Sequence, residues 1–213
     1  MNAHTQEVLN ILEKHYHGIG SALNYRNNFE LLVAVILSAQ TSDLQVNRIT
    51  ASLFAKYPTP SKMSSLSEEQ LALEIKSCGL YRNKAKNILA TVKILLNEYA
   101  GKVPHTREEL MKLPGVGRKT ANVVLANAFG ISAFGVDTHI FRVANRLGLT
   151  ESKNPLQTEE QLTRLIPEEK WNAAHHWLIW HGRKICKAQK PLCSVCPVNC
   201  LCPGNINKGV ENS

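Results

Sequence analysis

A glycine turn leads into a helix within the stretch Leu113-Pro114-Gly115-Val116-Gly117-Arg118-Lys119-Thr120-Ala121. Gly115 and Gly117 can both adopt positive φ, so the backbone N–H groups around them can approach a phosphate closely. The N-terminus of the following helix adds its partial positive charge. Lys119 stands in the first turn of that helix, where a cation opposes the helix dipole at a cost of about 0.3–1 kcal/mol. This lysine therefore requires a chemical or ligand-binding explanation.

The turn joins two segments with helical periodicity, and the whole predicts a helix-hairpin-helix. Apolar residues recur at three- and four-residue spacing over Thr106–Leu113 and over Arg118–Phe129. The loop amides of such a hairpin can hold one DNA phosphate without reading the base sequence. The alternative is a glycine-rich turn that only connects two packed helices. The expected DNA contacts are Gly115, Val116, Gly117 and Arg118.

Helical periodicity dominates the rest of the chain, so the predicted fold class is all-α. No segment shows the alternation of a strand. Proline and glycine breaks fall between the predicted helices, among them Pro58, Pro60 and Pro155. Asp43, Ser67 and Thr106 are expected to cap helices. The other predicted helices span His4–His15, Asn28–Ser38, Asp43–Lys56, Ser67–Ser77, Arg82–Tyr99, Thr138–Leu147, Thr158–Ile166 and Trp171–Lys184.

Composition favours a folded protein with an acidic partner. The chain has 213 residues, is 44% hydrophobic, and carries a formal net charge of +8. Nucleic acid is the obvious partner for such a charge, although a generally basic protein without that role has the same balance. The longest apolar run, Leu31–Leu37, is too short to cross a bilayer, and no signal peptide is apparent. The expectation is a cytoplasmic protein with no membrane partner.

Asp137 is the acidic residue that the sequence places best for chemistry beside Lys119. It precedes Thr138-His139, which open another helix, and an aspartate there is expected to be an N-cap. A capping carboxylate is held rigidly and stays ionised. The helix N-terminus and Arg118 would both favour the neutral Lys119 amine, which is the nucleophilic form. Attack on an anomeric sugar carbon, assisted by the carboxylate, would give a Schiff base.

The C-terminal part of the chain is rich in cysteine, and metal binding explains it better than disulfides. Five of the six cysteines lie in the last 30 residues. Cys186, Cys193, Cys196 and Cys202 follow the spacing C-x6-C-x2-C-x5-C. Four clustered thiolates can bind zinc or a [4Fe-4S] cluster, and the single C-x2-C pair favours iron–sulfur. On chemistry alone Cys200 could replace Cys202.

Several motifs together resemble the helix-hairpin-helix DNA glycosylases and, within them, the iron–sulfur-containing endonuclease III family. The resemblance covers nearly the whole chain. It is carried by Leu113–Ala121, Val136-Asp137-Thr138-His139, Leu37-Ser38-Ala39-Gln40-Thr41-Ser42-Asp43, Gly79-Leu80-Tyr81 and the cysteine spacing.

The resemblance implies a two-lobed fold. One lobe is a six-helix barrel over residues 22–132, with the hairpin at about 106–129. The other lobe combines residues 1–21 with 133–213 and holds a [4Fe-4S] cluster in the loop 186–202. Lys119 and Asp137 would then face each other across the boundary between the lobes.

The resemblance also implies an activity, that of a bifunctional DNA glycosylase and abasic-site lyase of base excision repair. Lys119 would be the nucleophile and Asp137 its essential partner. Such an enzyme removes oxidised pyrimidines and cleaves the strand by β-elimination. The alternatives are a monofunctional or mismatch-directed glycosylase of the same superfamily and a DNA-binding module without catalysis.

Further residue roles follow from the same resemblance. It assigns the cluster to Cys186, Cys193, Cys196 and Cys202, leaving Cys200 as a free thiol. Gln40 and Leu80 match the family's gap-filling and wedge residues. The sequence pattern alone would instead predict a core residue at Leu80 and a loop residue at Gln40. Expected DNA contacts also include His139, Lys187 and Lys190. The expected partner is duplex DNA with damaged bases or abasic sites, bound by a monomer near the nucleoid.

Overall fold

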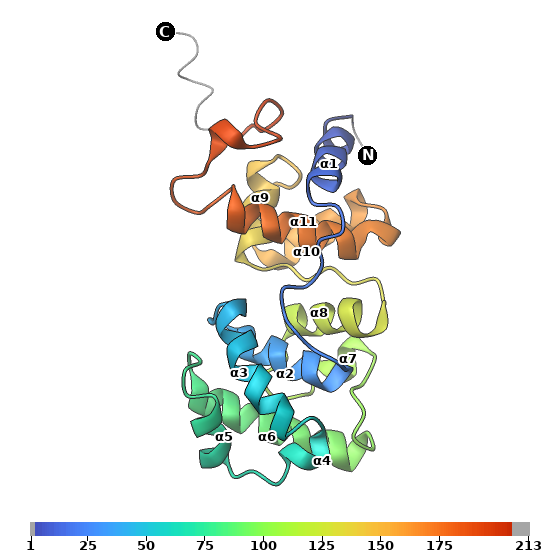
Figure 1. Cartoon of the computed structure of the whole chain (residues 1–213). Helices are drawn as coiled ribbons and strands as arrows, with labels where there is room; N and C mark the ends of the chain where they lie inside the picture. Colours follow the sequence, from blue (N-terminus) through green and yellow to red (C-terminus); the bar gives the residue numbers. More distant parts are fainter. Residues whose placement is uncertain (1–2, 206–213) are drawn as a thin grey trace. The chain divides into compact units, whose positions relative to one another are not determined.

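The computed structural model describes residues 3–205, in which helices are joined by turns and loops and no β-strand occurs (Figure 1). The all-α prediction is therefore confirmed. The α-helices are α1 (Ala3–His15), α2 (Asn28–Ser38), α3 (Asp43–Lys56), α4 (Pro60–Met63), α5 (Glu68–Glu74), α6 (Tyr81–Glu98), α7 (Arg107–Leu110), α8 (Arg118–Phe129), α9 (Thr138–Arg146), α10 (Pro155–Leu165) and α11 (Trp171–Lys184). Two 3-10 turns, η1 (Glu168–Lys170) and η2 (Cys193–Val195), complete the described elements.

The chain divides into two compact units. One is continuous and spans Ser21–Ile131, so it contains α2 to α8. The other combines the residues up to Gly20 with those from Ser132 onward, and it contains α1, α9, α10 and α11. None of the described helices has the length and apolar character needed to span a membrane.

Helix α2 forms the centre of the unit Ser21–Ile131. Residues Leu31 to Leu37 are all buried, as expected of a helix that is apolar on every side. Helices α3, α6 and α8 pack against it, α4 and α5 cover α6, and α7 packs on α8 (Figure 1). This packing fixes the ends of α2, α6 and α8, and the site residues of this unit lie at those ends.

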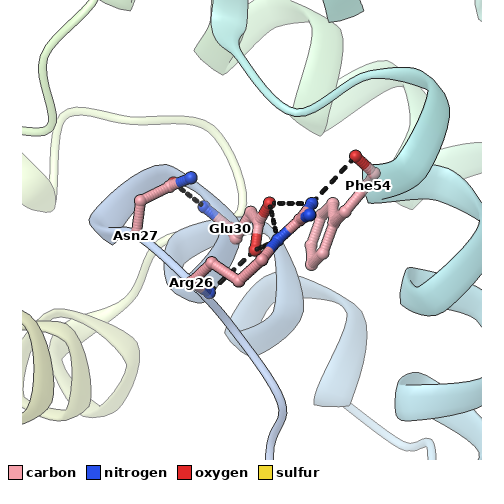
Figure 2. A network of polar contacts seen from close by, with 4 residues as sticks. All are labelled: Arg26, Asn27, Glu30 and Phe54. Atoms are coloured by element: carbon pink, nitrogen blue, oxygen red, sulfur yellow. Dashed lines mark hydrogen bonds and ion pairs between the residues drawn. The ribbon is translucent and has the colours of Figure 1, made fainter.

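A polar network holds the start of α2 (Figure 2). The Asn27 side chain accepts a hydrogen bond from the Glu30 backbone N–H at 2.9 Å and so caps the helix. Glu30 is buried, and its carboxylate accepts from Arg26 Nη2 at 2.7 Å and from Arg26 Nε at 3.1 Å. The same Nη2 donates to the Phe54 carbonyl at 3.0 Å. Arg26 thereby satisfies a buried carboxylate and ties α2 to the end of α3.

The second unit packs around α11. Helices α9 and α1 both contact α11, and α10 contacts α9. Its core includes Val8 and Leu12 of α1, Ile140 of α9 and Leu178 of α11, all fully buried. Segments from both ends of the chain therefore share one hydrophobic core.

Most predicted helices form, and their differences from the prediction lie at their ends. The short helix α4 was not predicted, because it begins at Pro60, which was expected to be a break. Ser42 caps α3 by accepting from the Gln45 N–H, so the prediction of Asp43 as the cap is wrong by one residue. Pro155 is not a break but the first residue of α10, a position where its missing N–H costs nothing. The caps predicted at Ser67 and Thr106 are confirmed. Helices α5 and α7 are shorter than predicted, because their last residues turn without continuing the helix.

Candidate functional site

The hairpin turn lies between α7 and α8, and its two glycines have different backbones. Gly115 has φ +80°, and a Cβ on it would lie 3.1 Å from Asn87 Nδ2, so a side chain there would be strained and tightly packed. Gly117 has φ −91° and open space around it. The expectation of positive φ at both glycines is therefore wrong for Gly117. The lack of a side chain at Gly117 instead leaves the start of α8 open to a ligand.

Lys119 is the second residue of α8 and is exposed. Gly117 occupies the N-cap position, so no side-chain oxygen caps the first turn of this helix. The N–H groups of an uncapped first turn suit an anion. Arg118 is half-buried beside Lys119. Val116 is buried, so this residue can meet DNA only through its backbone.

Side-chain bonds fasten the hairpin to its surroundings. Thr91 Oγ1 of α6 donates to the Pro114 carbonyl at 3.1 Å. Arg107 Nε of α7 donates to Asn122 Oδ1 of α8 at 2.8 Å, which links the two helices of the hairpin. The turn is thus held in place by a hydrogen bond from α6 and by the hydrogen bond that links α7 to α8.

Gln40 and Leu80 share an unusual backbone. Their φ values are +55° and +57°, in the left-handed region that residues with a side chain rarely enter. Both are exposed, and Leu80 retains 57% of its accessible surface although it is a large apolar residue. The interpretation of Leu80 as a core residue is excluded by this exposure. Strained backbones of this kind concentrate at functional sites.

Asp137 is the N-cap of α9, as predicted. Its Oδ1 accepts from the backbone N–H of His139 at 2.9 Å and of Ile140 at 2.8 Å. The carboxyl group is half-buried, and the preceding Val136 is buried in the core of its unit. Asp137 belongs to the unit that contains α9, whereas Lys119 belongs to the unit Ser21–Ile131. Both functional groups are therefore held at the first turn of a helix.

The remaining predicted DNA contacts differ in their surroundings. His139 is half-buried, and its Nδ1 lies 3.3 Å from Arg142 Nη2. Lys187 and Lys190 are exposed in the segment after Cys186, and Lys190 has φ +49°. The two lysines can meet a phosphate directly, whereas His139 is engaged with a neighbouring arginine.

Four cysteines line one small cavity of about 20 Å³ in the unit that contains α9 and α11: Cys186, Cys193, Cys196 and Cys202. All cysteines of the described chain are free thiols. The exposed Cys200 is not among the residues that line the cavity, and its Sγ donates to Asn199 Oδ1 at 3.1 Å. Within residues 3–205 no three His, Cys, Asp or Glu side chains are grouped as ligands of a metal ion. Four thiols around one cavity are nevertheless the donor set that a [4Fe-4S] cluster takes.

The thiols affect one another electrostatically. Burial raises the pKa of the Cys196 thiol, and Cys202, Cys186 and Cys193 add to that rise, while a hydrogen bond to the Val198 backbone opposes it. The thiolate form of Cys196 is therefore disfavoured by its surroundings in the chain alone. A bound metal would supply positive charge and release thiol protons on binding.

A neutral histidine lies between a phenol and one of these thiols. Burial lowers the pKa of His181 to about 4, and the neighbouring His15 adds to that effect. Its Nδ1 is 3.1 Å from Tyr16 Oη, and its Nε2 is 3.6 Å from Cys196 Sγ. Burial also raises the pKa of Tyr16 to about 12, with smaller contributions from Cys196 and Cys186. The ring and the phenol are thus uncharged at neutral pH.

Two arginines of α9 support the cysteine segment, and the sequence reasoning missed both. Arg142 donates to the Cys186 carbonyl from Nε at 3.1 Å and from Nη2 at 2.9 Å. Arg146 donates to the carbonyls of Lys187 at 2.7 Å and Ala188 at 3.0 Å. In return, Cys202 Sγ donates to the Arg146 carbonyl at 3.2 Å. The only sequence signal for them is their four-residue spacing on a helix that begins at Asp137.

Comparison with known proteins places this architecture in a family. A family model described as "HhH-GPD superfamily base excision DNA repair protein" matches residues 33–168, more than half of the chain. Endonuclease III of Rickettsia conorii is 52% identical over 201 residues, which cover 94% of this chain and 96% of that protein.

Two solved structures are similar over almost the entire chain. A non-covalent endonuclease III–DNA complex matches with a TM-score of 0.91 and 46% identity, covering 96% of this chain and 97% of that one. A trapped covalent endonuclease III–DNA intermediate matches with a TM-score of 0.90 and 46% identity, covering 96% and 98%.

The helical fold, the hairpin and the matching family model identify the chain as a member of the helix-hairpin-helix superfamily of base excision DNA repair proteins. Within that superfamily, the chain belongs to the endonuclease III family. It is an enzyme of base excision repair, a DNA glycosylase with abasic-site lyase activity. The two-lobed glycosylase fold expected from the motifs is confirmed.

Proposed function

We propose that the chain removes oxidised pyrimidines from duplex DNA, with Lys119 as the nucleophile and Asp137 as its acidic partner. The observation that carries the proposal is the exposed Lys119 amine in the uncapped first turn of α8, directly after a phosphate-binding type of turn. The solved relatives support it, since one holds DNA and another is a covalent DNA intermediate.

The reaction begins at the sugar of the damaged nucleotide. The neutral Lys119 Nζ attacks C1′, the bond from C1′ to the base breaks, and the base leaves with the bonding electrons and a proton. The sugar ring opens to an imine between C1′ and Nζ. Asp137 carries a fixed negative charge that stabilises positive charge at the sugar and assists the proton transfers.

Strand cleavage follows from the same imine. A proton leaves C2′, and the electrons of that bond expel the 3′ phosphate in a β-elimination. Water then releases the sugar remnant from Lys119 Nζ. A lysine is required for this sequence, because its amine forms the imine that acidifies C2′.

The hairpin and the two strained residues bind and open the duplex in this proposal. The amides of the turn from Gly115 to Gly117, together with Arg118, hold a backbone phosphate. An extruded nucleotide leaves a gap in the stack. Gln40 fills that gap and Leu80 wedges the opposite strand, which is why two exposed side chains have strained backbones.

Four cysteine thiolates would hold a [4Fe-4S] cluster in this proposal: Cys186, Cys193, Cys196 and Cys202. The cluster would cross-link the C-terminal segment and so give it a fixed structure. Arg142 and Arg146 orient the segment around Cys186 from α9, and the exposed Lys187 and Lys190 then meet phosphates, with His139 nearby on α9. The enzyme acts as a monomer on chromosomal DNA in the cytoplasm.

Borohydride trapping tests the nucleophile. The wild-type chain is expected to form a covalent complex with duplex DNA that contains an oxidised pyrimidine or an abasic site. Lys119→Gln removes the amine and is expected to abolish trapping and to lower strand cleavage by at least about 10³-fold. Lys119→Arg keeps the charge but cannot form the imine, so it should fail equally.

Lys112→Gln is the matched control, because Lys112 is an exposed lysine just before the hairpin. It should trap as the wild type does. A covalent complex that persists in Lys119→Gln contradicts the assignment. A panel of lesions, scored separately for base release and strand cleavage, tests the lesion class and distinguishes a monofunctional glycosylase.

A further inference from the structure

Side chains on one face of α6 contact the hairpin turn and the segments that carry Gln40 and Leu80. Lys84, Asn87 and Thr91 follow one another at helical spacing on this face. Thr91 holds the Pro114 carbonyl, and Asn87 lies close beneath Gly115. Lys84, one turn nearer the start of the helix, contacts the segments that carry Gln40 and Leu80.

Lys84 is a buried lysine whose ammonium is surrounded by acceptors. Only 5% of the residue is exposed. Its Nζ donates to the carbonyls of Leu37 at 2.8 Å and Ala39 at 2.6 Å, and to Thr41 Oγ1 at 3.0 Å. The carbonyls at the end of a helix lack intrahelical partners and carry partial negative charge. Lys84 therefore satisfies the C-terminal end of α2, where the polypeptide turns toward Gln40.

The same ammonium reaches the segment before Leu80. Its Nζ lies 3.1 Å from Cys78 Sγ, and this thiol donates to the Leu37 carbonyl at 3.3 Å. Thr41 Oγ1 accepts from the Gly79 N–H at 3.3 Å. The residues 39–41 and 78–80 are thus joined through one buried polar network, with Lys84 at its centre.

The two segments also touch directly. A Cβ on Gly79 would lie 3.0 Å from the Gln40 carbonyl, so the backbones are in close contact. Each segment then places one residue, Gln40 or Leu80, in the left-handed region. A strained backbone persists only where the surrounding structure over-determines it. The buried ammonium contacts both sides and, with the Thr41 hydroxyl and the Cys78 thiol, joins them.

We propose that Lys84 is a positioning residue for duplex opening, and that its ammonium fixes residues 39–41 and 78–80 relative to each other so that Gln40 and Leu80 enter the duplex together. This inference rests on the proposed function of those two residues. Lys84 is buried and contacts neither DNA nor the reacting atoms. It acts through the two turns it joins.

The test compares two duplexes under single-turnover conditions with saturating enzyme. Both contain an oxidised pyrimidine such as thymine glycol, opposite either a normal base or an abasic analogue that leaves no partner base. Filling the gap matters only for the first duplex. Lys84→Met is expected to lower base excision about 10- to 100-fold opposite a normal base, because small misplacements are costly. Opposite the abasic analogue the loss should be less than about threefold.

A second readout follows extrusion itself. With 2-aminopurine as the base opposite the lesion, wild-type enzyme should raise its fluorescence as the stack opens. Lys84→Met should lose most of this rise at unchanged occupancy. The matched control is Lys86→Met, which removes the same charge from an exposed position of α6 and should change neither readout.

Thr41→Val keeps the inference testable if Lys84→Met does not fold. It removes only the hydroxyl that joins the two segments and leaves both carbonyl bonds of Lys84 intact. It should reproduce the partner-dependent loss in weaker form. Equal losses on both duplexes, or no loss in either variant, overturn the positioning role.

Gln40→Ala and Leu80→Ala distinguish a failure of the inference on Lys84 from a failure of the proposed roles of Gln40 and Leu80. If these variants lose excision opposite a normal base while Lys84→Met and Thr41→Val do not, the inference on Lys84 is wrong and the proposed function stands. If Gln40→Ala and Leu80→Ala themselves excise at the wild-type rate, the proposed roles of these two residues are wrong.

Discussion

The hairpin region and the cysteine loop achieve a fixed shape by different means. The hairpin region comprises the turn 113–118 with residues 39–41 and 78–80, and the cysteine loop comprises residues 186–202. Lys84 and Thr91 of α6 hold the hairpin region through hydrogen bonds to the carbonyls of Ala39 and Pro114, and α6 and α8 both pack against the apolar α2. The cysteine loop has one short 3-10 turn and relies on two arginines and its thiols.

The difference concerns what each region needs in order to fold. The hairpin region needs no bound group to keep its shape, because buried hydrogen-bond donors and close backbone contacts hold its strained residues in place. The cysteine loop brings four thiols around one cavity, and burial together with the other three thiols raises the pKa of Cys196. The region proposed to bind and open the duplex is therefore organised by contacts within the protein, whereas the cysteine loop would be organised by the cluster it is proposed to hold.

The largest expected effect comes from removing one cysteine of the cysteine loop. Cys196→Ala removes one thiol of the cavity, so the iron content should fall from about four per chain to well below one. The visible absorbance of the purified protein should vanish with it. The free energy of unfolding of that unit should fall by several kcal/mol, because the binding energy of the proposed cluster would contribute to folding.

Cys200→Ala is the matched control for that variant. Its thiol is exposed and bonds only to the adjacent Asn199 among the contacts described. Iron content, absorbance and thermal stability should stay at the wild-type level. Loss of iron in Cys200→Ala would contradict the assignment of the four ligands.

A smaller effect distinguishes the two glycines of the hairpin region. Gly115→Ala forces a side chain into the left-handed region at a cost of about 1–2 kcal/mol, with further loss from the contact with Asn87. Denaturant unfolding should report this destabilisation. Gly117→Ala meets open space at φ −91°, so its stability should change by less than about 0.5 kcal/mol.

DNA affinity should respond differently from stability in this pair. Gly117→Ala places a methyl group in the open space where we propose that a phosphate binds, so it should weaken binding to duplex DNA in a titration at fixed salt. The methyl group of Gly115→Ala would face Asn87 instead, so this variant should weaken binding only by disturbing the turn. Equal destabilisation by the two substitutions would contradict the described backbone of the turn.

Much of the candidate site could be predicted because its signals are local. Gly115 to Lys119 lie within five residues, and the cap at Asp137 depends only on the residues that follow it. The all-α class followed from apolar spacing within each segment. Even the errors at Asp43 and Pro155 are shifts at helix ends, where neighbouring residues compete for the same cap or first-turn position.

The supporting residues could not be predicted, because their partners are distant in sequence. Lys84 meets Leu37 and Ala39, and Arg146 meets residues that follow Cys186. A lysine beside the apolar stripe of a helix suggests only a side chain that extends to solvent. The exposure of Leu80 was equally hidden, since an apolar residue after a glycine reads as core without the tertiary structure.

Hydrogen exchange on the protein before and after removal of the iron of the proposed cluster tests the contrast between the two regions most directly. Peptides from residues 186–202 are expected to lose their protection when the iron is removed by oxidation and chelation. Peptides from α6 and from residues 37–41 are expected to keep theirs. Equal loss of protection in both regions, or unchanged protection in the cysteine loop, would contradict the account.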